Sequence, residues 1–105
     1  MKLRQLQTLE EVAKDLIEGR DFYDQIEFGV GEYFTDSIVS NIQSLKVYAG
    51  SHAKHFGFYR LLGRPFPFAV YYDLFDEKVI VVGVLDMRKD PAWIREKLSF
   101  RSESI

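Results

Sequence analysis

The sequence contains no cysteine among its 105 residues. Disulfide bonds, thiolate metal sites and a cysteine nucleophile are therefore excluded together. The chain also lacks any apolar run approaching the roughly 20 residues that a membrane-spanning helix needs. Its first six residues hold no apolar segment of the length found in signal peptides. We therefore expect a protein of the reducing cytoplasm that makes no contact with a membrane.

Aromatic residues are abundant, with nine Phe, six Tyr and one Trp. Apolar residues make up 47% of the chain, which is typical of a globular domain and excludes wholesale disorder. The length predicts a single domain over residues 1–105, with a weak edge strand in 1–7 and a frayed tail in 99–105. Not all of the aromatic side chains can be interior, so we expect an exposed aromatic surface.

The formal net charge is only −2, but the charge is unevenly distributed. Residues 1–45 hold nine acids and four bases, a net charge of −5, whereas residues 46–105 hold ten bases and seven acids, a net charge of +3. Residues 46–64 contain four bases, two histidines and no acid. This asymmetry favours an anionic partner for one face, although a solvated loop with a local excess of bases fits equally well.

The N-terminal half has the spacing of two helices. Thr8 and Glu11 form the pattern of a capping box, which predicts a helix start at Thr8. Apolar residues then recur at helical spacing until residues 29–31, Gly-Val-Gly, interrupt them. Phe34, Ile38, Ile42 and Leu45 form the stripe of a second helix. The two helices are predicted to pair as an antiparallel hairpin.

The C-terminal half has the pattern of strands. Residues 66–72 have a period of two, with Phe66, Phe68, Val70 and Tyr72 on one face of a strand. Residues 79–85 are nearly all apolar, as in an interior strand buried on both faces. Residues 58–62 predict a third strand, and the short connections require antiparallel pairing. Asp90 and Pro91 then begin a short helix, with Trp93 as its core anchor. The predicted fold is α+β: an N-terminal antiparallel helical hairpin packed on one face of a three- to four-stranded antiparallel sheet, with a short C-terminal helix.

Four segments of the C-terminal half form an ordered set: residues 58–62 read FYRLL, residues 66–72 read FPFAVYY, residues 81–85 are apolar, and residues 88–91 read RKDP. In this order, these segments resemble the RelE/ParE toxin superfamily of bacterial plasmid stabilisation proteins. Upstream, Ala13-x-Asp15-Leu16, Phe22-Tyr23 and Gly29-x-Gly31-x-x-Phe34 match the helical hairpin of the family. The resemblance spans residues 9 to 98. One departure is that family members open with an alternating edge strand, whereas Leu3 and Leu6 do not alternate.

The resemblance implies the toxin of a type II toxin–antitoxin module, bound and neutralised by a cognate antitoxin. It leaves two chemistries open, because the fold does not separate them. ParE-like members inhibit DNA gyrase and are not nucleases, whereas RelE-like members are ribosome-dependent mRNA endonucleases. A solitary, non-toxic family member is a third reading. The resemblance is also compatible with a homodimer or a toxin–antitoxin hetero-oligomer.

Nuclease chemistry needs groups that this sequence does not supply at the matching positions. Nuclease members carry a basic residue on the strand that here reads Phe68-Ala69-Val70-Tyr71, at about Ala69. They also place an acid or base, often Tyr or His, near the C-terminus, and no Tyr or His follows Leu85. These absences favour the ParE-like reading and a protein that is not an enzyme.

The candidates for contact with a target or a nucleic acid are basic. They are Lys54, Arg60, Arg64, Arg88 and Lys89. Lys54, Arg60 and Arg64 could instead form salt bridges with the acidic helical hairpin. Arg88, at the end of the apolar strand, could instead pair with Asp86 or Asp90.

Tyr71 and Tyr72 are the candidates for antitoxin contact. Strand alternation places them on opposite faces of the sheet, so that one is predicted to be core and the other half-exposed. His52 and His55 are three residues apart without a third ligand, which is a weak metal signal and more typical of loop histidines. No metal and no cofactor is therefore expected.

Overall fold

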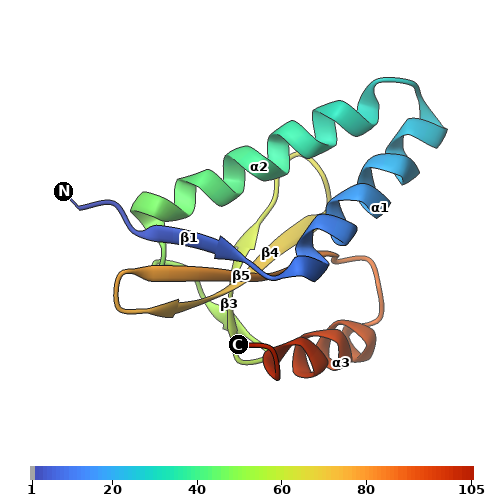
Figure 1. Ribbon diagram of the computed structural model, residues 1–105. Helices are drawn as coiled ribbons and strands as arrows, with labels where there is room; N and C mark the ends of the chain where they lie inside the picture. Colours follow the sequence, from blue (N-terminus) through green and yellow to red (C-terminus); the bar gives the residue numbers. More distant parts are fainter. Residues whose placement is uncertain (1) are drawn as a thin grey trace.

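A short strand and two helices form the N-terminal half (Figure 1). Strand β1 spans Gln5–Thr8, helix α1 spans Glu10–Ile26 and helix α2 spans Val30–Tyr48. The computed structural model describes residues 2–105. The turn between the helices depends on Gly29, whose φ of +93° lies in the left-handed region that glycine adopts without strain. The predicted helical hairpin is confirmed.

The two helices of the hairpin approach closely because glycines lie at their contact. A Cβ atom added to Gly31 would lie 2.4 Å from the backbone oxygen of Arg20, and one added to Gly19 would lie 2.5 Å from the ring of Phe34. The backbone N–H of Gly31 donates to Oδ1 of Asp24 at 2.8 Å. These contacts define the geometry of the hairpin tip.

The sheet has five strands in the order β1-β5-β4-β3-β2. Strand β2 spans Lys54–His55, β3 spans Phe58–Leu62, β4 spans Phe68–Phe75 and β5 spans Lys78–Asp86. Strand β1 is parallel to β5, and the other pairs are antiparallel. The sequence predicted the three long strands and a weak edge strand in residues 1–7, which the structure has as β1, and the structure adds β2 at the other edge. Strand β1 forms without an alternating pattern because only Leu6 among its residues is even partly buried.

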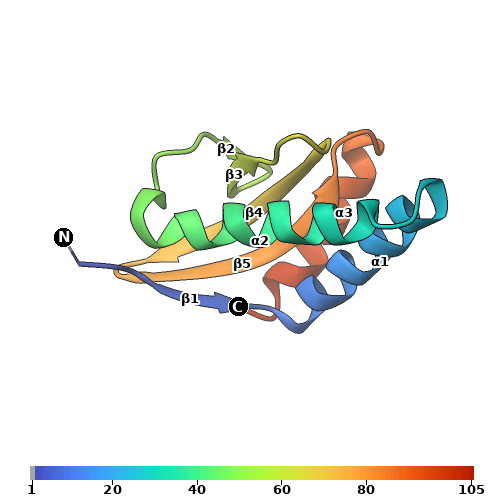
Figure 2. The ribbon, with the colours of Figure 1, turned by 90° about the horizontal axis from the view of Figure 1, so that it is seen from above.

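The helices cover both faces of the sheet, whereas the sequence predicted one (Figure 2). The hairpin packs on one face, and helix α3, which spans Pro91–Ser102, packs on the other. The side chains of β4 and β5 therefore contribute alternately to two cores. The core of the hairpin face includes Phe34, Ile38, Leu45, Val70, Tyr72 and Val81, and that of the α3 face includes Ala69, Tyr71, Val82, Ile94 and Leu98.

The ends of α1 and α3 differ from the sequence prediction. Thr8 belongs to β1 and does not cap α1, because the strand pairing continues through it and the N–H of Leu9 donates to the Val81 carbonyl at 3.0 Å. The predicted cap at Asp90 is confirmed, since its Oδ1 accepts from the N–H of Ala92 at 2.8 Å. The tail expected to fray from residue 99 is helical as far as Ser102. No helix within residues 2–105 is long and apolar enough to cross a bilayer.

Candidate functional site

The edge of β5 loses its strand neighbour halfway along. Strand β1 pairs with β5 only as far as Val81. At the next residue of β5, the pairing register with β4 shifts. Tyr72 pairs with Val81 and Tyr71 pairs with Gly83, which leaves Val82 as the extra residue of a β-bulge. The backbone groups of Val82 and Val84 on this edge would lack partners if other elements did not supply them.

Two charged side chains supply those partners. The carboxylate of Asp15, on α1, accepts from the N–H of Val84 at 3.0 Å. Nη1 of Arg101, on α3, donates to the carbonyl of Val82 at 3.1 Å. The tail residue Arg101 therefore closes the sheet edge together with Asp15, which lies within the apolar stripe of α1.

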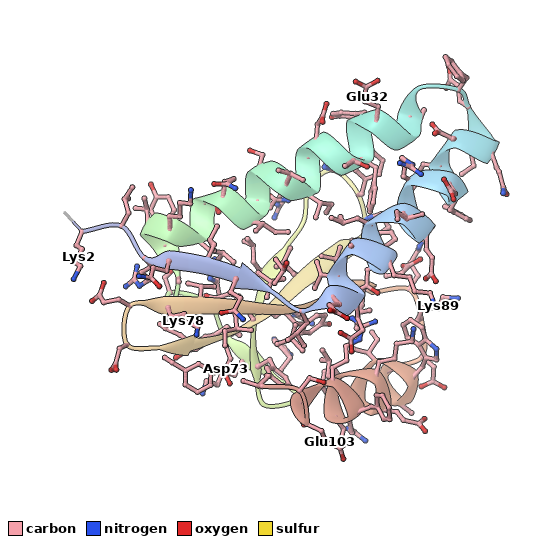
Figure 3. The ribbon with its side chains drawn as sticks, in the orientation of Figure 1. Lys2, Glu32, Asp73, Lys78, Lys89 and Glu103 are labelled. Carbon is pink, nitrogen blue, oxygen red and sulfur yellow. The ribbon has the colours of Figure 1, made fainter. Side chains whose placement is uncertain are left out.

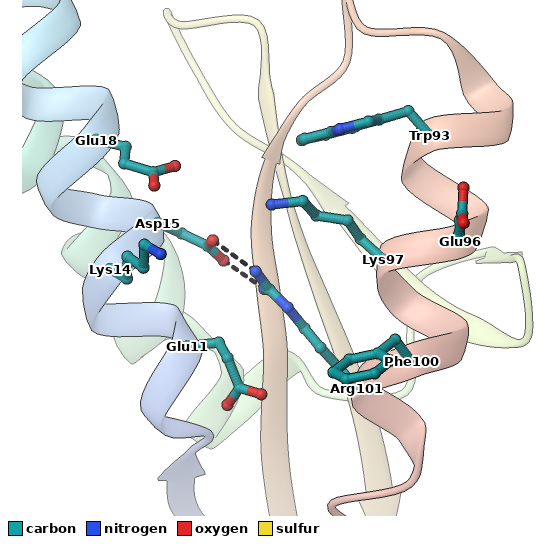
Figure 4. A pocket seen from close by; sticks show the side chains of 9 residues that line it. All are labelled: Glu11, Lys14, Asp15, Glu18, Trp93, Glu96, Lys97, Phe100 and Arg101. Carbon is teal, nitrogen blue, oxygen red and sulfur yellow. Dashed lines mark hydrogen bonds and ion pairs between the residues drawn. The ribbon is translucent and has the colours of Figure 1, made fainter.

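Asp15 and Arg101 also bind each other in a bidentate ion pair (Figure 4). The two N···O distances are 2.6 and 2.8 Å, and the side chains are 3% and 7% exposed. The hydrogen bonds from Arg101 to Asp15 raise the pKa of Arg101 above its ordinary value, against the opposing effect of burial. Both carboxylate oxygens of Asp15 and both terminal nitrogens of Arg101 are hydrogen-bonded, and the pair joins α1, β5 and α3.

A groove lies over this ion pair, between α1 and α3 (Figure 4). It consists of two adjoining hollows of about 500 and 240 Å³, both of which are lined by Asp15, Glu18, Trp93 and Lys97. Two ammonium groups lie near the ring of Trp93, with Nζ of Lys97 at 4.7 Å and Nζ of Lys89 at 5.5 Å from its centroid.

Both walls of the groove carry charges of both signs. The α1 wall carries Glu11, Lys14 and Glu18, and the α3 wall carries Glu96 and Lys97 beside Trp93 and Phe100, whose side chain is 73% exposed. An open groove with apolar surface and both signs of charge fits a polypeptide segment better than a small molecule. It is the candidate binding site of the chain.

Sequence reasoning did not identify this groove. Lys89 was a candidate, and it projects from the corner between β5 and α3 (Figure 3). Two features of the sequence could have indicated the groove. Asp15 is an acid within an apolar helical stripe, and Trp93 and Lys97 are four residues apart, which places them on one helix face. Arg101 carried no signal because its segment was assigned to a frayed tail.

The structure does not bring the basic candidates onto one face. Lys54 pairs with Tyr59 on the hairpin side of the sheet, with Nζ 4.8 Å from the ring of Tyr59. Arg60 pairs with Tyr71, whose side chain belongs to the α3 side. Arg64 lies in the β3–β4 loop. Within residues 2–105, none of these three forms an ion pair with the hairpin, so the expected salt bridges are absent from that range.

Arg88 has the structural contact that the sequence left open. Its guanidinium binds the carboxylate of Asp86 at 2.8 and 3.0 Å, and its backbone N–H donates to the same carboxylate at 2.9 Å. Burial opposes ionisation of Asp86, but these hydrogen bonds and the charges of Arg88 and Lys89 hold its pKa below the ordinary value. Arg88 therefore shapes the corner, and its guanidinium also lies 5.6 Å from the ring centroid of Phe22.

Tyr71 and Tyr72 lie on opposite faces, as predicted, but both are buried. Their exposed fractions are 1% and 0%, so the expectation that one is half-exposed is wrong. The reason is that each face of the sheet carries a helical layer, which covers both side chains. Neither ring is available on the surface of the isolated chain.

The hydroxyl of Tyr72 joins a small polar cluster. It accepts from the N–H of Gly50 at 2.9 Å and lies 2.5 Å from Nδ1 of His52. Burial lowers the pKa of His52, which favours its neutral form. His55 lies on β2. Within residues 2–105, no three His, Cys, Asp or Glu side chains lie close enough together to hold a metal ion.

Comparison with known proteins finds a solved structure of similar fold. No protein-family profile and no curated protein sequence matches the chain. A chain of a solved structure described as "Chromosomal ParDE TA system from P. aeruginosa" superposes with a TM-score of 0.70. The two share the same fold. The match covers 78% of this chain and 94% of that chain, at 16% sequence identity.

Proposed function

We propose that the chain is the toxin component of a type II toxin–antitoxin module, neutralised by a cognate antitoxin, and that it acts as a ParE-like inhibitor of DNA gyrase. The supporting observation is the shared fold with a chain of a ParDE toxin–antitoxin structure, which extends over 94% of that chain. The ordered motifs of the sequence point to the same superfamily. The alternative of a solitary, non-toxic member is tested by the same experiment.

The surroundings of Ala69 favour gyrase inhibition over RelE-like mRNA cleavage. Ala69 is 0% exposed and packs in the core beneath α3, so this position offers neither a charge nor access to a phosphate. The nearest aromatic hydroxyl along the same face of β4, that of Tyr71, is also buried, and burial raises its pKa. A general base near neutral pH needs a lower pKa and access to its substrate.

The groove between α1 and α3 is the proposed docking site for the antitoxin. A neutralising segment needs a concave surface with apolar anchors and charges that fix its orientation. The exposed ring of Phe100, the ring of Trp93 and the charges of Glu18 and Lys97 supply these features. This site replaces Tyr71 and Tyr72 as the proposed contact surface, because their side chains are buried.

The test is growth of a bacterial host after induction of this gene, alone and with the adjacent gene. Arrest that the adjacent gene relieves, accompanied by a DNA-damage response, is expected for gyrase inhibition. Arrest with immediate loss of protein synthesis would instead select mRNA cleavage. Unimpaired growth at confirmed folded expression would contradict the toxin proposal.

A groove variant tests the docking site separately. The double substitution Phe100→Ser and Lys97→Ser is expected to weaken binding of the purified antitoxin by about ten-fold or more, because it removes an apolar anchor and a charge. Phe75→Ser is the matched control, since Phe75 is also exposed, at 47%, but lies at the far end of β4. Equal affinity of the groove variant and the control would refute the groove as the site.

A further inference from the structure

The tip of the helical hairpin exposes an unusual amount of apolar surface. Among residues 2–105, twelve large hydrophobic side chains are exposed, and four of them lie within residues 22–33. Phe28 is 97% exposed, Ile26 66%, Tyr33 56% and Phe22 45%. Single exposed apolar residues are ordinary, but a concentration of aromatic ones at one end of a small domain marks an interaction surface.

The tip is held in one conformation. The N–H of Glu27 donates to the carbonyl of Tyr23 at 3.1 Å, and the N–H of Val30 donates to the carbonyl of Glu27 at 3.1 Å. The bond from Gly31 to Asp24 and the close helix contact at Gly31 fix the same turn from the other side. Phe28 is therefore presented by a defined turn, which reduces the entropy that binding would cost.

The charge of the hairpin around these apolar side chains is mostly negative, although the guanidinium of Arg88 lies 5.6 Å from the ring centroid of Phe22. Residues 18–36 contain six acids and one base, a net charge of −5 that equals the whole charge of residues 1–45. The single base, Arg20, already binds Asp21 at 3.3 Å. The carboxylate of Glu32 points outward from the first turn of α2 (Figure 3). An apolar centre with an acidic rim is complementary to an apolar surface rimmed by Lys and Arg.

We infer that the hairpin tip, residues 22–33, binds a basic amphipathic helical segment of another protein. The apolar face of that segment packs on Phe28, Ile26 and Tyr33, and its Lys or Arg side chains pair with Glu27 and Glu32. The aromatic side chains at the tip are the anchors, since large rigid rings dominate the energy of protein interfaces. Phe28, Ile26 and Tyr33 lie at the opposite end of the hairpin from Glu11, whereas Phe22 also lines the smaller hollow of the groove, so the two surfaces adjoin.

The acidic rim decides between the occupants of such a surface. An anionic membrane would be repelled by a net charge of −5, and so would the tip of a second copy of this chain. A basic segment gains from the same charge, and its affinity should fall as salt screens it.

The experiment uses the full chain and a fluorescent 18-residue helical peptide of Leu and Lys, with a Leu and Glu peptide of the same pattern as its control. Fluorescence anisotropy is expected to show binding of the Lys peptide alone, weakened several-fold between low and physiological salt. Phe28→Ser should weaken that binding by about ten-fold or more. Because Phe28 is almost fully exposed, this substitution should leave the melting temperature unchanged.

A matched variant and two further measurements separate the alternatives. Tyr48→Ser alters a side chain that is 60% exposed at the other end of α2, and it should bind the Lys peptide like the unaltered chain. Equal binding by Phe28→Ser, or equal binding of the Glu peptide, would overturn the inference. The inference would also be overturned if the chain floated with phosphatidylglycerol vesicles, or formed a dimer in sedimentation, and Phe28→Ser abolished that behaviour. These readouts need no toxicity, so they stand whether or not the chain arrests growth.

Discussion

The two faces of the sheet are stabilised by different means. On the hairpin face, two helices of 17 and 19 residues cover the strands with a largely apolar layer. On the other face, one helix of 12 residues covers a smaller core, and the buried ion pair of Arg101 with Asp15 fastens its end. The comparison teaches that a short helix over a small core is supplemented by a polar anchor, whereas the long hairpin, which supplies Asp15 to that anchor, is held mainly by apolar packing.

The ion pair gives the largest expected effect. Arg101→Met leaves the Asp15 carboxylate buried without its cation, and it should lower the free energy of unfolding by about 4 kcal/mol. Denaturant unfolding measures the loss. Adding Asp15→Leu removes the stranded charge, so the double variant should be more stable than Arg101→Met. A loss below about 1 kcal/mol for Arg101→Met would show that α3 is held by its apolar contacts.

A pair of matched truncations compares the two cores directly. Ile38 and Leu98 are both 0% exposed, the first on the hairpin face and the second beneath α3. Both alanine variants should lose stability, by about 3 kcal/mol for Ile38→Ala and about 2 kcal/mol for Leu98→Ala. The smaller loss is expected for Leu98 because a single short helix can move inward and fill part of the cavity. Chemical denaturation tests this order, and a larger loss at Leu98 would reverse the comparison.

The smallest effect concerns pH and the polar cluster under the hairpin. The pKa of His52 is lowered in the folded protein, so the unfolded chain binds its proton more readily. The folded state should therefore become less stable as the pH falls below about 6.5, the ordinary pKa of a histidine. The loss should level off once the pH is below the pKa of His52 in the folded protein. His52→Gln should flatten the melting temperature across this window. His55→Gln is the control, and an unchanged pH profile in the His52 variant would contradict the prediction.

Much of the fold could be predicted from particular residues. The stripe from Phe34 to Leu45 predicted α2, the apolar run at 79–85 predicted a strand buried on both faces, and Asp90 with Pro91 predicted the start of α3. The position of α3 could not be predicted from the strands. Their pattern shows that both faces of the sheet are apolar, but it does not show which helix covers which face. The weak edge strand predicted in residues 1–7 corresponds to β1 at Gln5–Thr8, but its bounds could not be predicted because an exposed edge strand needs no alternation.

The candidate site was less predictable than the fold. The basic candidates are close together in the sequence, but successive residues of a strand point to opposite faces, and Lys54 and Arg60 lie on opposite faces of the sheet. The groove arises from α1 and α3, which are more than 60 residues apart in the chain at their closest bounds. The four-residue spacing of Trp93 and Lys97 places them on one face of α3. That face lines a groove only because α3 packs opposite Glu18 of α1.

The sequence by itself determined the local elements and the two-sided apolar character of the central strands, because these depend on residue periodicity and on caps and turns nearby in the chain. It also determined the acidic tip, since those charges and aromatic residues are close neighbours in sequence. Only the tertiary structure decided that Asp15 meets Arg101 across 86 positions, that both tyrosines of β4 are buried and that a groove opens between α1 and α3. Such contacts depend on how complete layers pack against each other, and no local pattern encodes that arrangement.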